Sequence, residues 1–137
     1  MPKIFKSGLI GVFLILFGCN NKDEVNTLQI GKITEVKLYE TVENSKLNLS
    51  LRVENINDSR CPIGAVCFWE GNANVEFQLT TKKGKCKLSL DTHYPPSFVN
   101  DTIIEGIKYQ LIDVLPYPDI NEKHPLKSSV KILVGGK

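Results

Sequence analysis

Residues 58–73, DSRCPIGAVCFWEGNA, separate the two clearest strand patterns of the chain. They hold two of the four cysteines, Cys61 and Cys67, and the only tryptophan, Trp69. Pro62 and Gly64 lie between the two cysteines and favour a reversal of the chain. The stretch therefore predicts a disulfide-pinned loop between two strands.

Alternating apolar and polar residues flank this loop on both sides. Residues 46–53 carry leucine or valine at every second position, and residues 73–80 repeat the alternation. Such alternation predicts strands with one buried and one exposed face, as in an antiparallel sheet. Residues 55–58 are turn formers and are expected to end the first of these strands.

The remaining chain carries further strand patterns and no helical stripe with caps. Lys82-Lys83-Gly84 predicts a hairpin turn, and Pro116 and Pro118 are expected to end a strand. The other strand patterns cover residues 33–39, 85–91, 102–114 with a break at Gly106, and 130–134. The sequence predicts an all-β fold, a small antiparallel β-sandwich or partly open barrel of about six or seven strands.

The amino terminus has the features of a lipoprotein signal peptide. Lys3 and Lys6 precede an apolar run at residues 9–17, which is too short to span about 30 Å of hydrocarbon comfortably as a helix. Residues 16–19, Leu-Phe-Gly-Cys, resemble a bacterial lipobox. That resemblance implies removal of residues 1–18 and attachment of lipid, including an acyl chain such as palmitate, to Cys19. A plain secretory signal or an uncleaved anchor is the alternative.

A short polar tether and one domain are expected to follow the signal peptide. The tether, beginning with the lipidated Cys19, covers residues 19–27, and the domain covers residues 28–137. Residues 22–24, Lys-Asp-Glu, resemble the export signal of surface lipoproteins in Bacteroidetes-like bacteria; an ordinary charged linker is the alternative. We therefore expect acyl chains on Cys19 to hold the protein in the outer membrane, with its domain on the periplasmic face or the cell surface.

The charge balance argues against one class of partner. Without Lys3 and Lys6, the 17 basic side chains fall to 15, which equals the 15 acidic ones. A neutral chain without a basic run gives no support for nucleic-acid binding. We expect no nucleic-acid partner.

The cysteines predict one disulfide. Export permits thiol oxidation, and lipidation of Cys19 leaves three cysteines. Cys61 and Cys67 are the expected pair, since both lie outside the strand patterns. Cys86 shares the apolar face of its strand with Leu88 and Leu90, so we expect a buried free thiol. Pairing of Cys86 with either loop cysteine is the alternative.

Metal and catalytic chemistry have little support in the sequence. The three cysteines and a histidine would make four zinc ligands, but the Cys-x5-Cys spacing is not that of a zinc knuckle. His93 and His124 lie in proline-containing loops and are expected to face solvent. We predict no metal, no cofactor, no catalytic residue and no enzymatic activity.

The central loop holds the candidate binding residues Trp69, Pro62, Ile63 and Gly64. We expect Trp69 to pack over the disulfide, because it lies two residues beyond Cys67. An exposed platform for a sugar or a partner protein is the alternative. Arg60 and Glu70 flank the bridge and suit a solvated ion pair.

The motif DSRCP-x-G-x-x-C-x-W-x-G-x-A resembles the signature of a family of small, largely uncharacterised lipoproteins of Bacteroidetes-like bacteria. Val114, residues 116–118 and the last strand also resemble that family, whereas Cys86 lies outside its pattern. The resemblance covers most of residues 28–134 and implies location and fold, without an activity or ligand. We expect a lipid-anchored β-domain of the cell envelope with a non-catalytic binding or structural role, toward an envelope protein or glycan. The alternative is an inhibitor or immunity-type protein that presents the Cys61–Cys67 loop to an enzyme.

Overall fold

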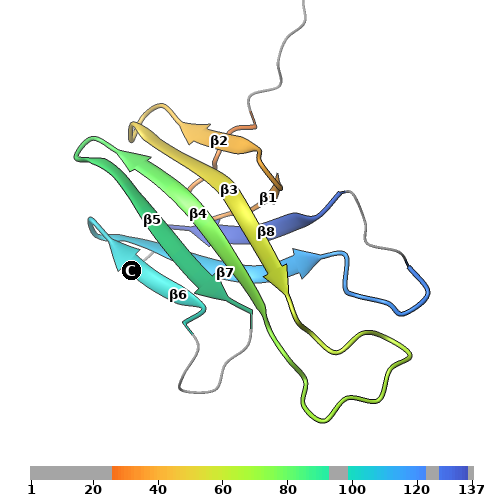
Figure 1. Cartoon of the computed structure of the whole chain (residues 1–137). Helices are drawn as coiled ribbons and strands as arrows, with labels where there is room; N and C mark the ends of the chain where they lie inside the picture. Colours follow the sequence, from red (N-terminus) through yellow and green to blue (C-terminus); the bar gives the residue numbers. More distant parts are fainter. Residues whose placement is uncertain (1–25, 93–98, 123–126, 136–137) are drawn as a thin grey trace, which may run out of the picture.

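The computed structural model describes residues 26–92, 99–122 and 127–135, which form two four-stranded antiparallel sheets packed as a sandwich (Figure 1). The all-β prediction is thereby confirmed. The signal peptide, Cys19, His93 and His124 lie outside the described residues. Within those residues there is no helix long and apolar enough to cross a bilayer.

Each sheet has a simple strand order. The first sheet runs β2-β3-β4-β5, with bounds Thr41–Asn44, Leu49–Asp58, Ala73–Thr81 and Gly84–Asp91. The second runs β1-β8-β7-β6, with bounds Ile33–Lys37, Ser129–Val134, Ile107–Leu115 and Asp101–Ile104. Most strands that are neighbours in a sheet are also consecutive in the chain. The exception is the pairing of β1 with β8, which brings the two ends of the domain together.

The core lies between the sheets and follows the alternation in the sequence. Along β3 and β4 the inward residues are fully buried, among them Leu51, Val53, Phe77 and Leu79. Tyr109 from β7 is the largest fully buried side chain of the described residues and adds a second aromatic ring to the core. Burial of so many apolar side chains is the main force that holds the two sheets face to face.

Several strand boundaries differ from the sequence prediction, and β2 brings the number of strands to eight. Residues 55–58 do not form a turn: they continue β3 past a bulge between Val53 and Asn55, with Ile56 opposite Val75. Pairing with β4 supplies hydrogen bonds that outweigh the turn preference of asparagine and aspartate. The short strand β2 was not predicted, and Leu47, expected in a strand, is 41% exposed in the turn before β3.

The turn that follows Leu28 and the loop after β3 lie at opposite ends of the sandwich. The amide of Leu28 donates to the carbonyl oxygen of Glu43, which pairs with Ser50 near the start of β3. The loop begins after Asp58, at the other end of that strand. At about 3.3 Å per residue, Ser50 and Asp58 are about 26 Å apart.

Candidate functional site

Backbone pairing continues past β3 and β4 and closes the base of the loop. The amide of Ser59 donates to the carbonyl oxygen of Asn72 at 2.8 Å, and the amide of Cys61 donates to that of Glu70 at 2.7 Å. Gly71 has φ +70°, and a Cβ there would lie 2.0 Å from the carbonyl oxygen of Ser59. Only glycine allows the two sides to approach this closely.

Cys61 and Cys67 form a disulfide, with Cα atoms 5.9 Å apart, as the sequence predicted. Cys86 is a free cysteine, also as predicted, but it is exposed rather than buried. Its Cα partner Leu79 is fully buried, so the sheet face is the expected one. Cys86 lies near the start of the edge strand β5, where less of the opposite sheet covers it.

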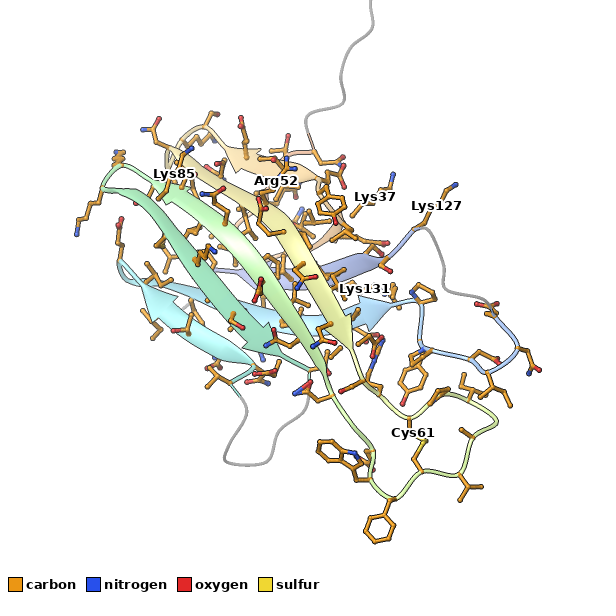
Figure 2. All side chains as sticks on the ribbon, in the orientation of Figure 1. Lys37, Arg52, Cys61, Lys85, Lys127 and Lys131 are labelled. Carbon is orange, nitrogen blue, oxygen red and sulfur yellow. A yellow bond between two sulfur atoms is a disulfide. The ribbon has the colours of Figure 1, made fainter. Side chains whose placement is uncertain are left out.

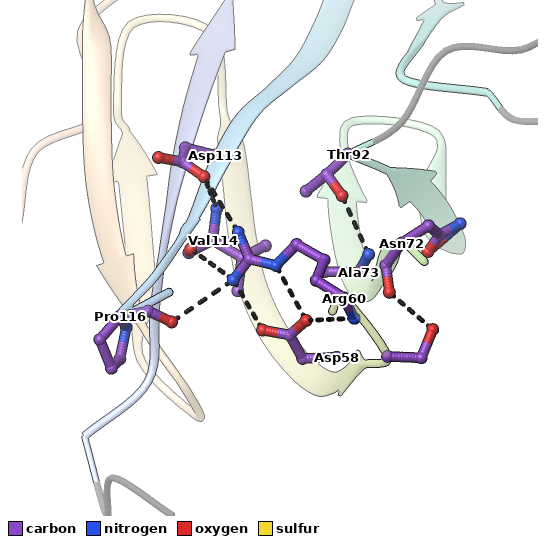
Figure 3. A network of polar contacts seen from close by, with 9 residues as sticks. Asp58, Arg60, Asn72, Ala73, Thr92, Asp113, Val114 and Pro116 are labelled. Atoms are coloured by element: carbon purple, nitrogen blue, oxygen red, sulfur yellow. Dashed lines mark hydrogen bonds and ion pairs between the residues drawn. The ribbon is translucent and has the colours of Figure 1, made fainter. Parts of the chain in front are cut away.

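A buried arginine anchors the first turn of the loop (Figure 3). Arg60 is 8% exposed, and its Nε and Nη2 donate to the carboxylate of Asp58 at 2.8 and 2.6 Å. Nη2 also donates to the carbonyl oxygen of Val114 at 2.8 Å, and Nη1 lies 3.4 Å from Oδ1 of Asp113. The guanidinium stacks 4.5 Å from the ring centroid of Tyr117. The expectation of a solvated Arg60 is therefore wrong.

The surroundings of Arg60 keep it charged despite burial. Burial acts to lower the pKa of Arg60, but the hydrogen bond and charge of Asp58, with the charge of Asp113, outweigh that effect and raise the pKa. A charged group withdrawn from water in this way is stabilised by opposite charge and by filled hydrogen bonds. Arg60 therefore acts as a permanent cationic link between the first sheet and the end of β7.

A second segment, residues 116–122 after β7, supports the loop from the side. The amide of Ile63 donates to the carbonyl oxygen of Pro118 at 2.9 Å, and the amide of Ile120 donates to that of Ile63 at 3.2 Å. A Cβ on Gly64 would lie 2.9 Å from Cδ1 of Ile120. Of the predicted binding residues, Ile63 and Gly64 thus hold the two segments together, although the side chain of Ile63 remains 57% exposed.

The tip of the loop exposes large apolar side chains to solvent. Val66 and Phe68 are fully exposed, at 104% and 108%, and Trp69 is 66% exposed. The expectation that Trp69 packs over the disulfide is wrong, because the chain bends at residues 68–69 and strand alternation does not apply there. Figure 2 shows the loop projecting from the sandwich with Cys61 at its inner side. We refer to Val66, Phe68 and Trp69 as the apolar tip.

Carboxylates surround the supported loop. A cleft of about 490 Å³ lies between the loop and residues 116–122, and its lining includes Asp58, Pro62, Asp119 and Glu122. Asp58 binds Arg60, Asp119 is partly exposed and accepts hydrogen bonds from Asn121, and Glu122 is exposed. The segment that supports the loop therefore contributes carboxylates to this cleft.

Phe68 was not recognised from the sequence, and neither was the role of Arg60. The sequence contained a signal for Arg60, since an aspartate two residues before an arginine allows a local ion pair. The partners of Arg60 on β7 could not be predicted from the sequence. Among the described residues, no group of three or more His, Cys, Asp or Glu side chains is placed to hold a metal ion. Comparisons with protein-family models, with curated proteins and with solved structures give no match for this chain.

Proposed function

We propose that this protein is a lipid-anchored protein of the cell envelope that binds a partner protein, without catalysis, through the apolar tip. The observation that supports binding is the exposure of Phe68 and Trp69 on a loop that is closed at its base and joined by a disulfide. The observation that supports the anchor is the lipobox-like sequence ending at Cys19.

Exposed aromatic side chains at a fixed position are typical of binding contacts. Aromatic residues are enriched among the side chains that dominate binding energies, because they bury large apolar areas with few rotatable bonds. The backbone hydrogen bonds at the base of the loop, the disulfide and Arg60 hold this loop in place before a partner binds. Ordering the loop then costs little free energy on association.

The charges around the tip define the chemistry of the partner. Glu70, Asp119 and Glu122 carry negative charge on the loop and on the segment beside it. Complementary charge favours specific encounter. We propose a partner with an apolar recess for Phe68 and Trp69 and basic residues at its rim. A protein suits this tip better than a glycan, because Val66 and Phe68 beside Trp69 offer no side-chain hydrogen bonds.

Capture from the native envelope tests the binding role. The lipidated protein serves as bait, and the variant Phe68→Ala plus Trp69→Ala is expected to lose the captured protein. The matched control is Ile33→Ala plus Ile103→Ala, which removes two side chains that are 56% and 67% exposed on the second sheet. Equal capture by the two double variants would contradict the proposal. Binding of a glycan panel with a change in Trp69 fluorescence would replace the protein partner by a sugar.

The anchor and its location have separate tests. Mass spectrometry of the mature protein is expected to show an amino terminus at Cys19 with added diacylglyceryl and acyl mass. A protein that begins elsewhere, without lipid, would contradict the anchor. Proteolysis of intact cells distinguishes the two orientations: digestion of the domain indicates the cell surface, and protection indicates the periplasmic face.

The supported ring of residues 61–67 favours a second candidate, an inhibitor or immunity-type protein. Such proteins present a rigid loop to an enzyme cleft, and here Ile63 is held by Pro118 on one side while Cys61 is held by Glu70 on the other. In that case the captured partner is an enzyme whose activity falls on binding. Cys61→Ser plus Cys67→Ser is expected to relieve the inhibition while the sandwich remains folded.

A further inference from the structure

We propose that the end of the sandwich nearest the amino-terminal tether binds an anionic membrane surface, so that the apolar tip points away from the membrane. The surface involved is distinct from the loop. The proposal rests on the anchor at Cys19 for its orientation, but the attraction to anionic lipid is a property of the domain itself.

Four turns meet at this end and form one face, which we call the tether-end face: residues 29–32, 45–48, 82–83 and 105–106. The side-chain amide of Asn44 donates to the carbonyl oxygen of Leu28 at 2.9 Å, which joins the first two turns. A surface hollow lined by Asn44, Ser45 and Thr80 extends toward the third. Thr81 Oγ1 donates to Oε1 of Glu105 at 2.9 Å and joins the third turn to the fourth.

The tether-end face is basic. Its turns carry Lys32, Lys46, Lys82 and Lys83, and Lys85 follows directly on β5. Figure 2 shows Lys85 at this end of the domain, far from Cys61. The acidic residues here are Glu105, which accepts the hydrogen bond from Thr81, and the exposed Glu43 on β2. The opposite end carries Glu70, Asp119 and Glu122 together with Lys37 and Lys127, so the lysines are concentrated at the tether-end face.

The same face has an apolar groove. A hollow of about 510 Å³ lies between residues 27–30 and residues 44–47. Ile30 and Leu47 line it and are each 41% exposed, whereas Leu28 is fully buried. Lysines beside exposed aliphatic side chains suit the boundary between headgroups and acyl chains, where the ammonium groups meet phosphate and the aliphatic groups leave water.

The position of the anchor lets this face reach the lipid. Residues 19–25 span at most about 25 Å when fully extended. They connect Cys19 to Asn26, which lies alongside β2 and precedes the first turn of the tether-end face by three residues. The attraction of lysines to anionic headgroups fades within about 10 Å at ordinary salt, and the loop begins about 26 Å farther along the sheet. An anionic lipid surface therefore attracts the tether-end face more strongly than the opposite end.

Vesicle sedimentation tests the face without the anchor. Every described contact lies within residues 26–135, so a chain of residues 19–137 with Cys19→Ser retains all of them. It is expected to bind vesicles that contain phosphatidylglycerol, to bind pure phosphatidylcholine at least about tenfold more weakly, and to dissociate in high salt. Equal binding to both kinds of vesicle, or binding to neither, would overturn the proposal.

Matched charge reversals locate the attraction. Lys32→Glu plus Lys46→Glu alters the tether-end face and is expected to weaken binding to the anionic vesicles about tenfold. Lys37→Glu plus Lys127→Glu makes the same change in net charge, at the other end of β1 and before β8, and is expected to leave most binding intact. Figure 2 shows both control lysines away from Lys85. Equal losses from the two pairs would mean that net charge, rather than this face, attracts the lipid.

The single tryptophan reports orientation in the lipidated protein. On anionic vesicles, the fluorescence of Trp69 is expected to be quenched by soluble iodide and not to be quenched by bromine-labelled lipid. Quenching by the labelled lipid would show that the apolar tip inserts, which overturns the orientation. If the native protein proves to carry no lipid on Cys19, the sedimentation experiment still shows whether the tether-end face binds anionic lipid. Failure of the anchor and failure of the face are therefore distinguishable.

Discussion

Nη2 of Arg60 donates a hydrogen bond to the carbonyl oxygen of Val114 at 2.8 Å. Arg60 lies at the start of the loop that follows β3, and Val114 lies near the end of β7 in the other sheet. One guanidinium thus ties the two sheets together at the end from which the apolar tip projects (Figure 3). The position of the loop therefore depends on a buried ion as well as on the disulfide.

Replacement of Arg60 is expected to lower the free energy of unfolding substantially. Arg60→Ala leaves Asp58 and the carbonyl oxygen of Val114 without their donor, and we expect a loss of about 3 kcal/mol in the free energy of unfolding. The chain's other arginine, Arg52, pairs with Glu54 at 2.9 Å, but the side chains are 43% and 40% exposed. Arg52→Ala is therefore expected to cost less than about 1 kcal/mol. Denaturant unfolding measures both, and similar losses would contradict the role of Arg60.

The disulfide is expected to contribute modestly to stability. Cys61→Ser plus Cys67→Ser should lower the free energy of unfolding by about 2 kcal/mol, because the closed ring is short. The near-ultraviolet spectrum of the core should persist. Cys86→Ser is the control and should change the unfolding energy by less than about 0.5 kcal/mol, since the thiol is exposed. A peptide that links Cys86 to either loop cysteine, found by mass mapping of the non-reduced protein, would contradict the pairing.

Gly71 is expected to tolerate no side chain. In Gly71→Ala the new Cβ would meet the carbonyl oxygen of Ser59 at 2.0 Å, so the paired base of the loop must open. We expect a loss of at least about 3 kcal/mol. Gly106 has a similar φ, +76° against +70°, but nothing lies within 4 Å of a Cβ there. Gly106→Ala should cost only about 1 kcal/mol. Thermal unfolding of the two variants separates the clash from backbone strain, and equal shifts would exclude the clash.

Tyr109 is expected to make the domain sensitive to alkali. Burial, followed by the charges of Glu105 and Cys86, raises the pKa of Tyr109 to about 12. The unfolded chain, with a tyrosine pKa near 10, releases this proton first, so the free energy of unfolding is unaffected below about pH 10. It then falls by about 3 kcal/mol between about pH 10 and 12.

Tyr109→Phe isolates that effect. The hydroxyl of Tyr109 is buried without a hydrogen-bond partner among the described residues, so its removal should not destabilise the protein at pH 7. The variant should lose less stability than the wild type between about pH 10 and 12, where lysines titrate equally in both proteins. Parallel pH profiles of unfolding would contradict the assignment.

The alternation of apolar residues in β3 and β4 was sufficient to predict an antiparallel sheet with one buried face, because the period of a strand is two residues. The pairing of Cys61 with Cys67 was also readable from local spacing. The exposure of Cys86 was not, because alternation indicates a face of the sheet and not what covers that face. The exposure of Trp69 was not either, because the chain bends there and alternation does not apply. Residues 55–58 became strand because β4 lay beside them, which no local preference expresses.

Local pattern by itself determined that this chain forms an all-β domain with a pinned loop, since side-chain alternation and turn chemistry act over a few residues. The tertiary structure alone decided that Arg60 is buried, because Asp113 and the carbonyl oxygen of Val114 come from a strand more than fifty positions along the chain. It also decided that lysines from three separate turns share one end while the apolar tip stands at the other. Both arrangements depend on which strands pair, and pairing is set by burial of the common core.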